Sequence, residues 1–236
     1  VIWSGRGGTM LGIYDYTVVL TYLSLLSAGA GIMVTLSGKG HPYMGTFFLL
    51  FCGLCDAFDG KVARTKKNRT QMEENYGIQI DSLSDLVAFG VLPACIGVAM
   101  IRLSPFHHSA RMMTWRGWVM VGFLYSILVL YILAAMIRLA YFNVTEEERK
   151  KTEGGVRKYY TGLPVTSVSL ILPFVLFLQY VTPCDITPVY FMTILLVGVA
   201  FLSKFQVRKP GLRGILIMVG IGAAEFAITL VCMLLK

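Results

Sequence analysis

Long apolar stretches separated by short polar connections run through most of this chain. A helix that crosses the hydrocarbon core of a bilayer needs roughly 20 predominantly apolar residues. About seven stretches are long enough: Tyr16–Ser37, Met44–Arg64, Gly77–Leu103, Arg116–Phe142, Leu163–Tyr180, Thr187–Phe205 and Gly214–Leu235. No alternation with the period of a β-strand recurs, and backbone polar groups in lipid must be paired within helices or closed barrels. The sequence therefore predicts an all-α integral membrane protein, a bundle of about seven transmembrane helices.

The composition agrees with a membrane location. Of the 236 residues, 56% are hydrophobic and only 14% are charged, whereas soluble domains carry about 25% charged residues. The mean hydropathy is +0.69. The formal net charge of +8 would fit a protein that binds nucleic acid, but the excess of Lys and Arg in the cytoplasmic loops of membrane proteins explains it as well. We therefore expect membrane lipids, and no nucleic acid, as partners.

Basic residues gather in alternate connections. The connections after the second, fourth and sixth stretches contain Arg64, Lys66, Lys67, Arg69, Arg149, Lys150, Lys151, Arg157, Lys158, Lys204, Arg208, Lys209 and Arg213. The other connections carry fewer, and the one between Tyr180 and Thr187 carries none. Because positively charged loops stay in the cytoplasm, we predict a multi-pass protein with its N-terminus and the 65–76 connection on the cytoplasmic side.

Four aspartates interrupt the second and third stretches. An acidic residue within a transmembrane helix costs about 2.5–3.5 kcal/mol on insertion scales, so four of them require a reason. Asp56 and Asp59 are spaced i, i+3, and Asp81 and Asp85 are spaced i, i+4, which places each pair on one helix face. The short connection between the two helices makes them an antiparallel hairpin whose acidic faces can meet. Converging carboxylates repel one another unless a cation neutralises them, and all-oxygen ligation suits Mg²⁺ or Mn²⁺.

Small and basic residues continue the acidic face of the second stretch. Gly60 and Ala63 leave space next to the backbone, and Arg64 adds a guanidinium that suits a phosphate. A single intramembrane aspartate is often a packed residue or part of an ion path, but packing does not explain four of them with these neighbours. A cation transporter that uses the cluster as its ion site stays open as an alternative of another class, although it has no evident need for the Gly, Ala and Arg.

Together these residues resemble a known signature. In order, the chain reads Asp56-x-x-Asp59-Gly60-x-x-Ala63-Arg64 and then Gly77-x-x-x-Asp81-x-x-x-Asp85. This pattern is similar to the signature of the CDP-alcohol phosphotransferase family, except that the segment between Arg64 and Gly77 is longer than in the family. Extra residues in a connection cost little. The resemblance implies the six-helix transmembrane core of that family.

Three further blocks resemble the bacterial and archaeal phosphatidylserine synthases within the family. They are Asp81–Ala94 (DSLSDLVAFGVLPA), Arg138–Asn143 (RLAYFN, with Tyr141 where Arg is usual) and Gly162–Pro164 (GLP). What this implies is transfer of the phosphatidyl group of CDP-diacylglycerol to L-serine, giving phosphatidylserine and CMP. Another acceptor, such as glycerol 3-phosphate or inositol phosphate, stays open, because only these blocks favour serine.

The resemblance also implies roles for the residues of the signature. Asp56, Asp59, Asp81 and Asp85 are implied to hold two divalent cations, Mg²⁺ or Mn²⁺, that bind the pyrophosphate. Asp85 is implied to lie at the edge of the metal site and to act as the base that takes the proton of the serine hydroxyl. CDP-diacylglycerol is implied to lie against Asp56, Asp59, Gly60, Ala63 and Arg64.

The residues that could contact serine are basic rather than acidic, because the negatively charged serine carboxylate needs a cation. Arg138, Lys204 and Arg208 can supply one. For Arg138 the alternative is snorkelling to the membrane interface, and for the other two it is contact with lipid headgroups. Asn143 can hydrogen-bond serine or cap its helix, and both interpretations stay open.

The remaining expectations concern the chain as a whole. The first nine residues, Val1–Thr9, are Gly-rich and precede Met10, so we interpret them as an artificial extension. Residues 10–236 contain no internal repeat and no separate soluble domain, and we expect them to form a single transmembrane catalytic domain. The family resemblance implies a homodimer. We expect a multi-pass protein of the plasma membrane whose active site faces the cytoplasm.

Overall fold

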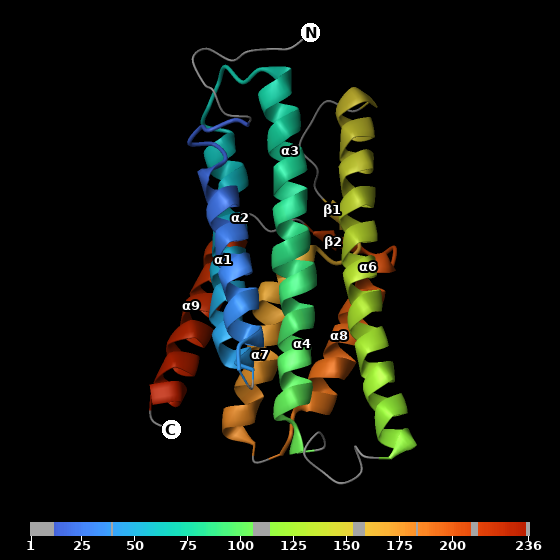
Figure 1. The fold of residues 1–236 in the computed structure, drawn as a ribbon. Coiled ribbons are helices and arrows are strands. Elements are labelled where there is room, and N and C mark those ends of the chain that lie inside the picture. Colours follow the sequence, from blue (N-terminus) through green and yellow to red (C-terminus); the bar gives the residue numbers. More distant parts are fainter. Residues whose placement is uncertain are drawn as a thin grey trace.

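The computed structural model describes residues 12–38, 40–105, 114–152, 159–182, 184–208 and 212–234. The predicted extension, Val1–Thr9, lies outside the described residues. Within them, helices dominate and run side by side as a bundle (Figure 1). The prediction of an all-α membrane protein is confirmed.

The helices follow the predicted stretches. They are α1 Val19–Leu36, α2 Pro42–Ala63, α3 Gln71–Asp85, α4 Leu92–Leu103, α6 Trp115–Thr152, α7 Val168–Val181, α8 Thr187–Leu202 and α9 Leu212–Leu234. A π-helical turn, Leu86–Val91, joins α3 to α4 without a break, and a 3₁₀ turn, Val165–Ser167, leads into α7. Among the described residues, three continuous helices are long and apolar enough to cross a bilayer by themselves: Val19–Leu36, Gln71–Leu103 and Trp115–Arg149.

Two helices extend by more than one turn beyond their predicted limits. The third predicted stretch begins at Gly77, but α3 begins at Gln71, because Thr70 and Glu73 form a capping box. The Thr70 hydroxyl accepts a hydrogen bond from the Glu73 N–H at 3.2 Å, and the Glu73 carboxylate accepts one from the Thr70 N–H at 2.9 Å. Each bond satisfies an N–H at or beside the helix start, which stabilises the extra turn. The second case is α6, which continues to Thr152, whereas the predicted fourth stretch ends at Phe142.

One small element was not predicted from the sequence. Strands β1 (Tyr159–Thr161) and β2 (Gln206–Arg208) pair antiparallel, with Tyr160 opposite Val207. This ribbon joins the segment before α7 to the segment after α8. It therefore ties together two connections that are far apart in the sequence.

Two tyrosine side chains hydrogen-bond to the backbone of the continuous α3–α4 helix. Pro93 has no N–H, so it cannot donate to the carbonyl of Phe89 one turn earlier. The buried Tyr131 of α6 donates its hydroxyl to that carbonyl at 2.6 Å, and the buried Tyr190 of α8 donates to the carbonyl of Pro93 at 2.7 Å. A buried carbonyl without a donor would be costly. These bonds therefore fix α6 and α8 against the helix just beyond Asp85.

Candidate functional site

The α2–α3 hairpin brings acidic side chains together inside the bundle. The carboxylates of Asp56, Asp81 and Asp85 each offer an oxygen within 4.8 Å of the others. Asp85 is buried, with 8% of its surface exposed, and the other two are half-buried. Three carboxylates this close, away from water, form the most distinctive polar feature of the described residues.

Asp59 has a different place from the other three. Its carboxylate accepts a hydrogen bond from the Gly60 N–H and lies beside the carboxylate of Asp81, but it is not part of the tight set. The sequence interpretation put Asp85 at the edge of the cluster. In the structure Asp85 is one of the three carboxylates that lie within 4.8 Å of one another, whereas Asp59 lies outside that set, beside Asp81.

The three central aspartates fit a hard divalent cation. Two oxygens bound to one Mg²⁺ are at most about 4.2 Å apart, because each lies about 2.1 Å from the ion. The observed spread, up to 4.8 Å, is close to that limit, so small side-chain rotations would complete a site. Carboxylate oxygens are the donors that Mg²⁺ and Mn²⁺ prefer. The cluster can therefore hold a divalent cation.

The small and basic residues of the signature line the adjacent face of α2. A methyl group built on Gly60 would meet only the guanidinium of Arg64, at 3.6 Å from Nη1. Arg64 is exposed at the C-terminal end of α2, and Ala63 is half-buried in its last turn. An exposed guanidinium next to an uncrowded backbone suits a phosphate that enters from this end of α2.

Two of the candidate serine contacts line one cavity. The cavity has a volume of about 110 Å³ and lies where α6, α8 and β1 meet; its lining residues are Ile137, Arg138, Tyr141, Thr161, Phe201, Leu202, Ser203 and Lys204. None of these lining residues is acidic. The structure therefore brings two basic residues, Arg138 and Lys204, to the lining of one small cavity whose surface is otherwise mostly apolar, and which we call the cationic cavity. The backbone of Arg208 pairs with Tyr159 in the ribbon beside it, and its side chain lies outside the described residues.

Arg138 is held inside the protein. Its side chain is buried, its Nε donates to the carbonyl of Leu163 at 3.0 Å, and its guanidinium lies 5.7 Å from the centre of the Phe142 ring. Snorkelling into the interface is thus not what this residue does. The GLP block explains the arrangement: Gly162 has φ +76°, and a Cβ there would lie 2.8 Å from the Ser203 carbonyl. Only glycine lets the chain pass this close while presenting the next carbonyl to Arg138.

Asn143 connects α6 to the acidic helix. It lies within α6, well before its end at Thr152, so the capping alternative is wrong. Its Nδ2 donates to the hydroxyl of Ser82 at 2.6 Å, and Ser82 follows Asp81 directly in the chain. Ser82 was missed in the sequence interpretation, although it lies inside the signature. The bond fixes the register of α6 against α3 at the level of the aspartates.

Comparisons with known proteins decide the family. The CDP-alcohol phosphatidyltransferase family profile matches residues 16–203. The chain belongs to this family. The resemblance seen in the signature is therefore confirmed, and the match ends at Ser203, within the lining of the cationic cavity.

Similar relatives carry related names. The chain is 34% identical over 166 residues to the CDP-diacylglycerol–serine O-phosphatidyltransferase of Saccharomyces cerevisiae, covering 69% of this chain and 52% of the relative. It is 26% identical over 232 residues to that of Mycobacterium bovis, covering 97% and 71%. It is 35% identical over 157 residues to the archaetidylserine synthase of Methanothermobacter thermautotrophicus, covering 65% and 55%. The chain thus spans about half the length of the yeast and archaeal relatives. No solved structure matches it.

Proposed function

We propose that this protein transfers the phosphatidyl group of CDP-diacylglycerol to L-serine, releasing CMP and phosphatidylserine. The observation that carries the proposal is the convergence of Asp56, Asp81 and Asp85 within 4.8 Å in a member of a family that handles CDP-alcohols. The names of the relatives support serine as the acceptor.

The donor would bind along the cytoplasmic half of α2. Two divalent cations, Mg²⁺ or Mn²⁺, held by the three central aspartates and Asp59, would neutralise charge on the pyrophosphate and on the leaving CMP. Arg64 would contact a phosphate oxygen, while Gly60 and Ala63 let the nucleotide approach the backbone. The acyl chains would stay in the bilayer, which explains why the site lies at the end of membrane helices.

Asp85 would act as the base. The hydroxyl oxygen of serine attacks the β-phosphorus, a new P–O bond forms, and the P–O bond to CMP breaks. Asp85 takes the hydroxyl proton, which requires hydrogen-bond reach of that hydroxyl. The central, buried position of Asp85 in the cluster supports this role, because the acceptor must meet the donor where the phosphate is held.

The cationic cavity would receive the serine carboxylate. Arg138 and Lys204 line it, and we keep Arg208 as a further candidate contact and Asn143 as a residue that can reach the acceptor. Two basic side chains in one cavity suit a phosphorylated acceptor as well. Glycerol 3-phosphate and inositol phosphate are therefore the alternative acceptors that the test must include.

The wider setting is part of the same proposal. We infer that residues 10–236 act as one catalytic domain in the plasma membrane, that the aspartates face the cytoplasm, and that the protein is a homodimer. The basic connections on one side of the bundle support the orientation. Family resemblance alone supports the dimer.

A single assay tests the reaction. The purified full chain in lipid nanodiscs is incubated with CDP-diacylglycerol, Mn²⁺ or Mg²⁺ and each candidate acceptor, and CMP release is measured. We expect release with serine and none after a strong chelator removes the metal. Release with glycerol 3-phosphate but not serine would refute the serine acceptor. Metal flux in proteoliposomes without any dependence on a cytidine nucleotide would instead favour a cation transporter.

A further inference from the structure

Three separate segments meet at Lys66, on the connection between α2 and α3. The ammonium of Lys66 lies 2.5 Å from Asp15 Oδ2 in the segment before α1 and 2.9 Å from Glu73 Oε1 in the first turn of α3. The three side chains are only 20–26% exposed, so they are partly shielded from water and salt. Lys66 thus binds two carboxylates at once, one from each side of the connection.

Hydroxyl contacts reinforce the same junction. The Tyr22 hydroxyl of α1 is 2.9 Å from the Tyr76 hydroxyl of α3 and donates to the carbonyl of Ile13. The Thr65 hydroxyl lies 3.4 Å from that of Tyr16. The segment before α1 is therefore attached both to the connection and to α3, and Figure 1 shows it lying at the same end of the bundle.

The charges of the junction depend on one another. Hydrogen bonds to Asp15 and Glu73 raise the pKa of Lys66, and the hydrogen bond from Lys66 lowers the pKa of both carboxyl groups. All three groups are therefore ionised at neutral pH, and the attraction acts under ordinary conditions.

The junction lies about two to three turns from the acidic cluster on both helices. At 1.5 Å per residue, Asp56 is about 10 Å along α2 from its end at Ala63, and Asp81 is about 12 Å along α3 from Glu73. Over such short lengths a helix is stiff, so the spacing of the two helix ends sets the spacing of the aspartates further along. The connection is also where this chain is longer than the family signature, and Lys66 and Glu73 both lie in that segment.

We propose that Lys66 is a positioning residue for the metal site. Because it forms ion pairs with both Asp15 and Glu73, it holds the ends of α2 and α3 at the separation that lets Asp56 and Asp81 share a cation. The inference rests on the metal site of the proposed function. It assigns a purpose to the lengthened connection, which forms a charged junction with the segment before α1.

The test measures metal binding directly. Mn²⁺ is titrated into the purified full chain in nanodiscs, and free Mn²⁺ is followed by its electron paramagnetic resonance signal. We expect Lys66→Met to weaken Mn²⁺ binding about tenfold, because the two helix ends are then no longer held together by the charged junction. Lys66→Arg, which keeps the charge and its reach, should stay within about twofold of the parent.

Two variants make the comparison sharp. Lys67→Met removes the neighbouring exposed lysine and should leave Mn²⁺ binding unchanged. Glu73→Gln removes one charge of the junction but preserves the capping box, because Gln can replace Glu in that motif. It should weaken binding less than Lys66→Met, and it provides the test if that variant does not fold.

Each outcome decides the matter. Mn²⁺ binding by Lys66→Met equal to that by Lys67→Met would overturn the inference, even if the first variant melts at a lower temperature. A parent protein that binds no Mn²⁺ would refute the metal site itself, and with it the proposed mechanism. Normal binding by the parent, Lys66→Arg and Lys67→Met, with weakened binding only in Lys66→Met and Glu73→Gln, is the result that we expect.

Discussion

Asp85 is the residue to which the proposed mechanism gives the proton transfer. It is the most buried of the four aspartates and lies among the central three, where it can both hold a cation and accept a proton. The sequence could not separate these roles, because helical spacing places Asp81 and Asp85 on one face without stating which of them meets Asp56.

Replacing this carboxylate should separate binding from turnover. We expect Asp85→Asn to lower kcat by about 10²–10⁴-fold, the usual contribution of a general base, while much of the affinity for CDP-diacylglycerol remains. Turnover is measured by CMP release and affinity by competition with a cytidine nucleotide. Equal losses of both would mean that Asp85 is chiefly an essential ligand. The same two measurements on Asp59→Asn, which changes a carboxylate at the edge of the cluster, provide the matched comparison with Asp85→Asn.

Gly162 positions the neighbouring Leu163 carbonyl, which accepts the hydrogen bond of Arg138. Its φ of +76° and the approach of the Ser203 carbonyl leave no room for a side chain. Gly162→Ala should therefore displace the Leu163 carbonyl that holds Arg138. We expect the KM for serine to rise at least about tenfold, since a hydrogen bond to a charged group is worth about 1.5–3 kcal/mol.

The control for this substitution is Gly122→Ala, on the exposed face of α6 where a methyl group meets nothing within 4 Å. It should leave the KM for serine unchanged. A Gly162→Ala protein with normal KM would show that Arg138 does not bind the acceptor.

At the scale of elements, caps and connections decide where helices begin and how they are joined. The apolar stretches predicted that the helices exist, but α3 and α6 are longer than their apolar parts because polar residues extend them. For α3 the reason is the capping box of Thr70 and Glu73. The ribbon of β1 and β2 was not predicted because three-residue strands carry almost no periodic signal.

A carboxylate that links α4 to α8, at the other end of the bundle, gives a pH test. Asp185 accepts hydrogen bonds from the hydroxyls of Ser104, at the end of α4, and Thr187, at the start of α8, and from the Thr187 N–H. Partial burial would raise the pKa of Asp185, but these hydrogen bonds outweigh it and hold the pKa below its ordinary value. The ionised form is thus favoured by folding.

The sign of the effect follows from that direction. A depressed carboxyl pKa adds stability above the unfolded value, about 3.9, and the added stability is lost as the pH falls through the folded value. We expect the parent to be more stable than Asp185→Asn by about 1 kcal/mol at pH 7, and the difference to shrink below pH 4. Melting in detergent at several pH values measures it. A difference that does not change with pH would contradict the assignment.

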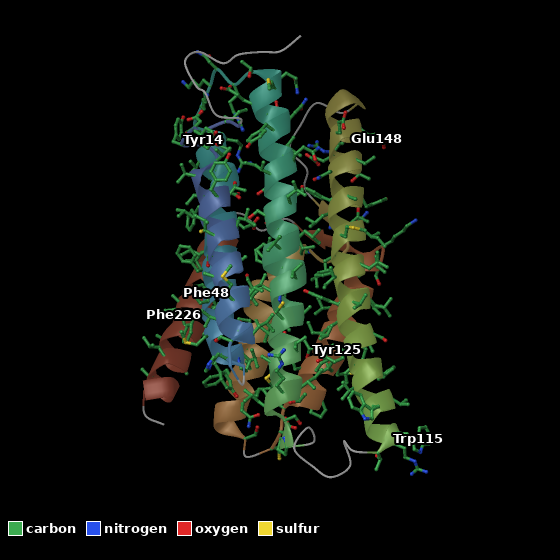
Figure 2. The ribbon with its side chains drawn as sticks, viewed as in Figure 1. Tyr14, Phe48, Trp115, Tyr125, Glu148 and Phe226 are labelled. Atoms are coloured by element: carbon green, nitrogen blue, oxygen red, sulfur yellow. The ribbon has the colours of Figure 1, made fainter. Side chains whose placement is uncertain are left out.

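At the scale of the whole molecule, the question is which end faces the cytoplasm. Figure 2 labels Trp115 at one end of α6 and Glu148 near the other. Trp115 and Trp118 are about 70% exposed, as expected for tryptophans at a membrane interface. The basic connections and the aspartates belong to the opposite end, which positive-inside counting assigns to the cytoplasm.

An exposed native cysteine tests this orientation. Cys184 is exposed in the connection between α7 and α8, whereas Cys52 and Cys55 are buried. We expect an impermeant maleimide to label Cys184 in intact cells and to lose this labelling in Cys184→Ser. A cysteine placed at Lys67, in the Cys184→Ser background, should react only after the membrane is opened. Labelling of that cysteine in intact cells would reverse the orientation.

The sequence by itself determined the features that depend on local periodicity. Apolar length established the membrane helices, and the i, i+3 and i, i+4 spacing placed two acidic faces on one hairpin. The signature was local as well, so the family followed from it. These properties can be predicted without knowledge of the tertiary contacts, because each is decided within a few turns of one helix.

Only the tertiary structure decided how distant segments meet. The peripheral place of Asp59, the burial of Arg138, the bond from Asn143 to Ser82 and the junction at Lys66 all depend on the register between helices and on the path of connections. Periodicity along one helix carries no information about that register. The aspartates were therefore recognisable in the sequence, whereas the contacts that surround them were visible only in the folded chain.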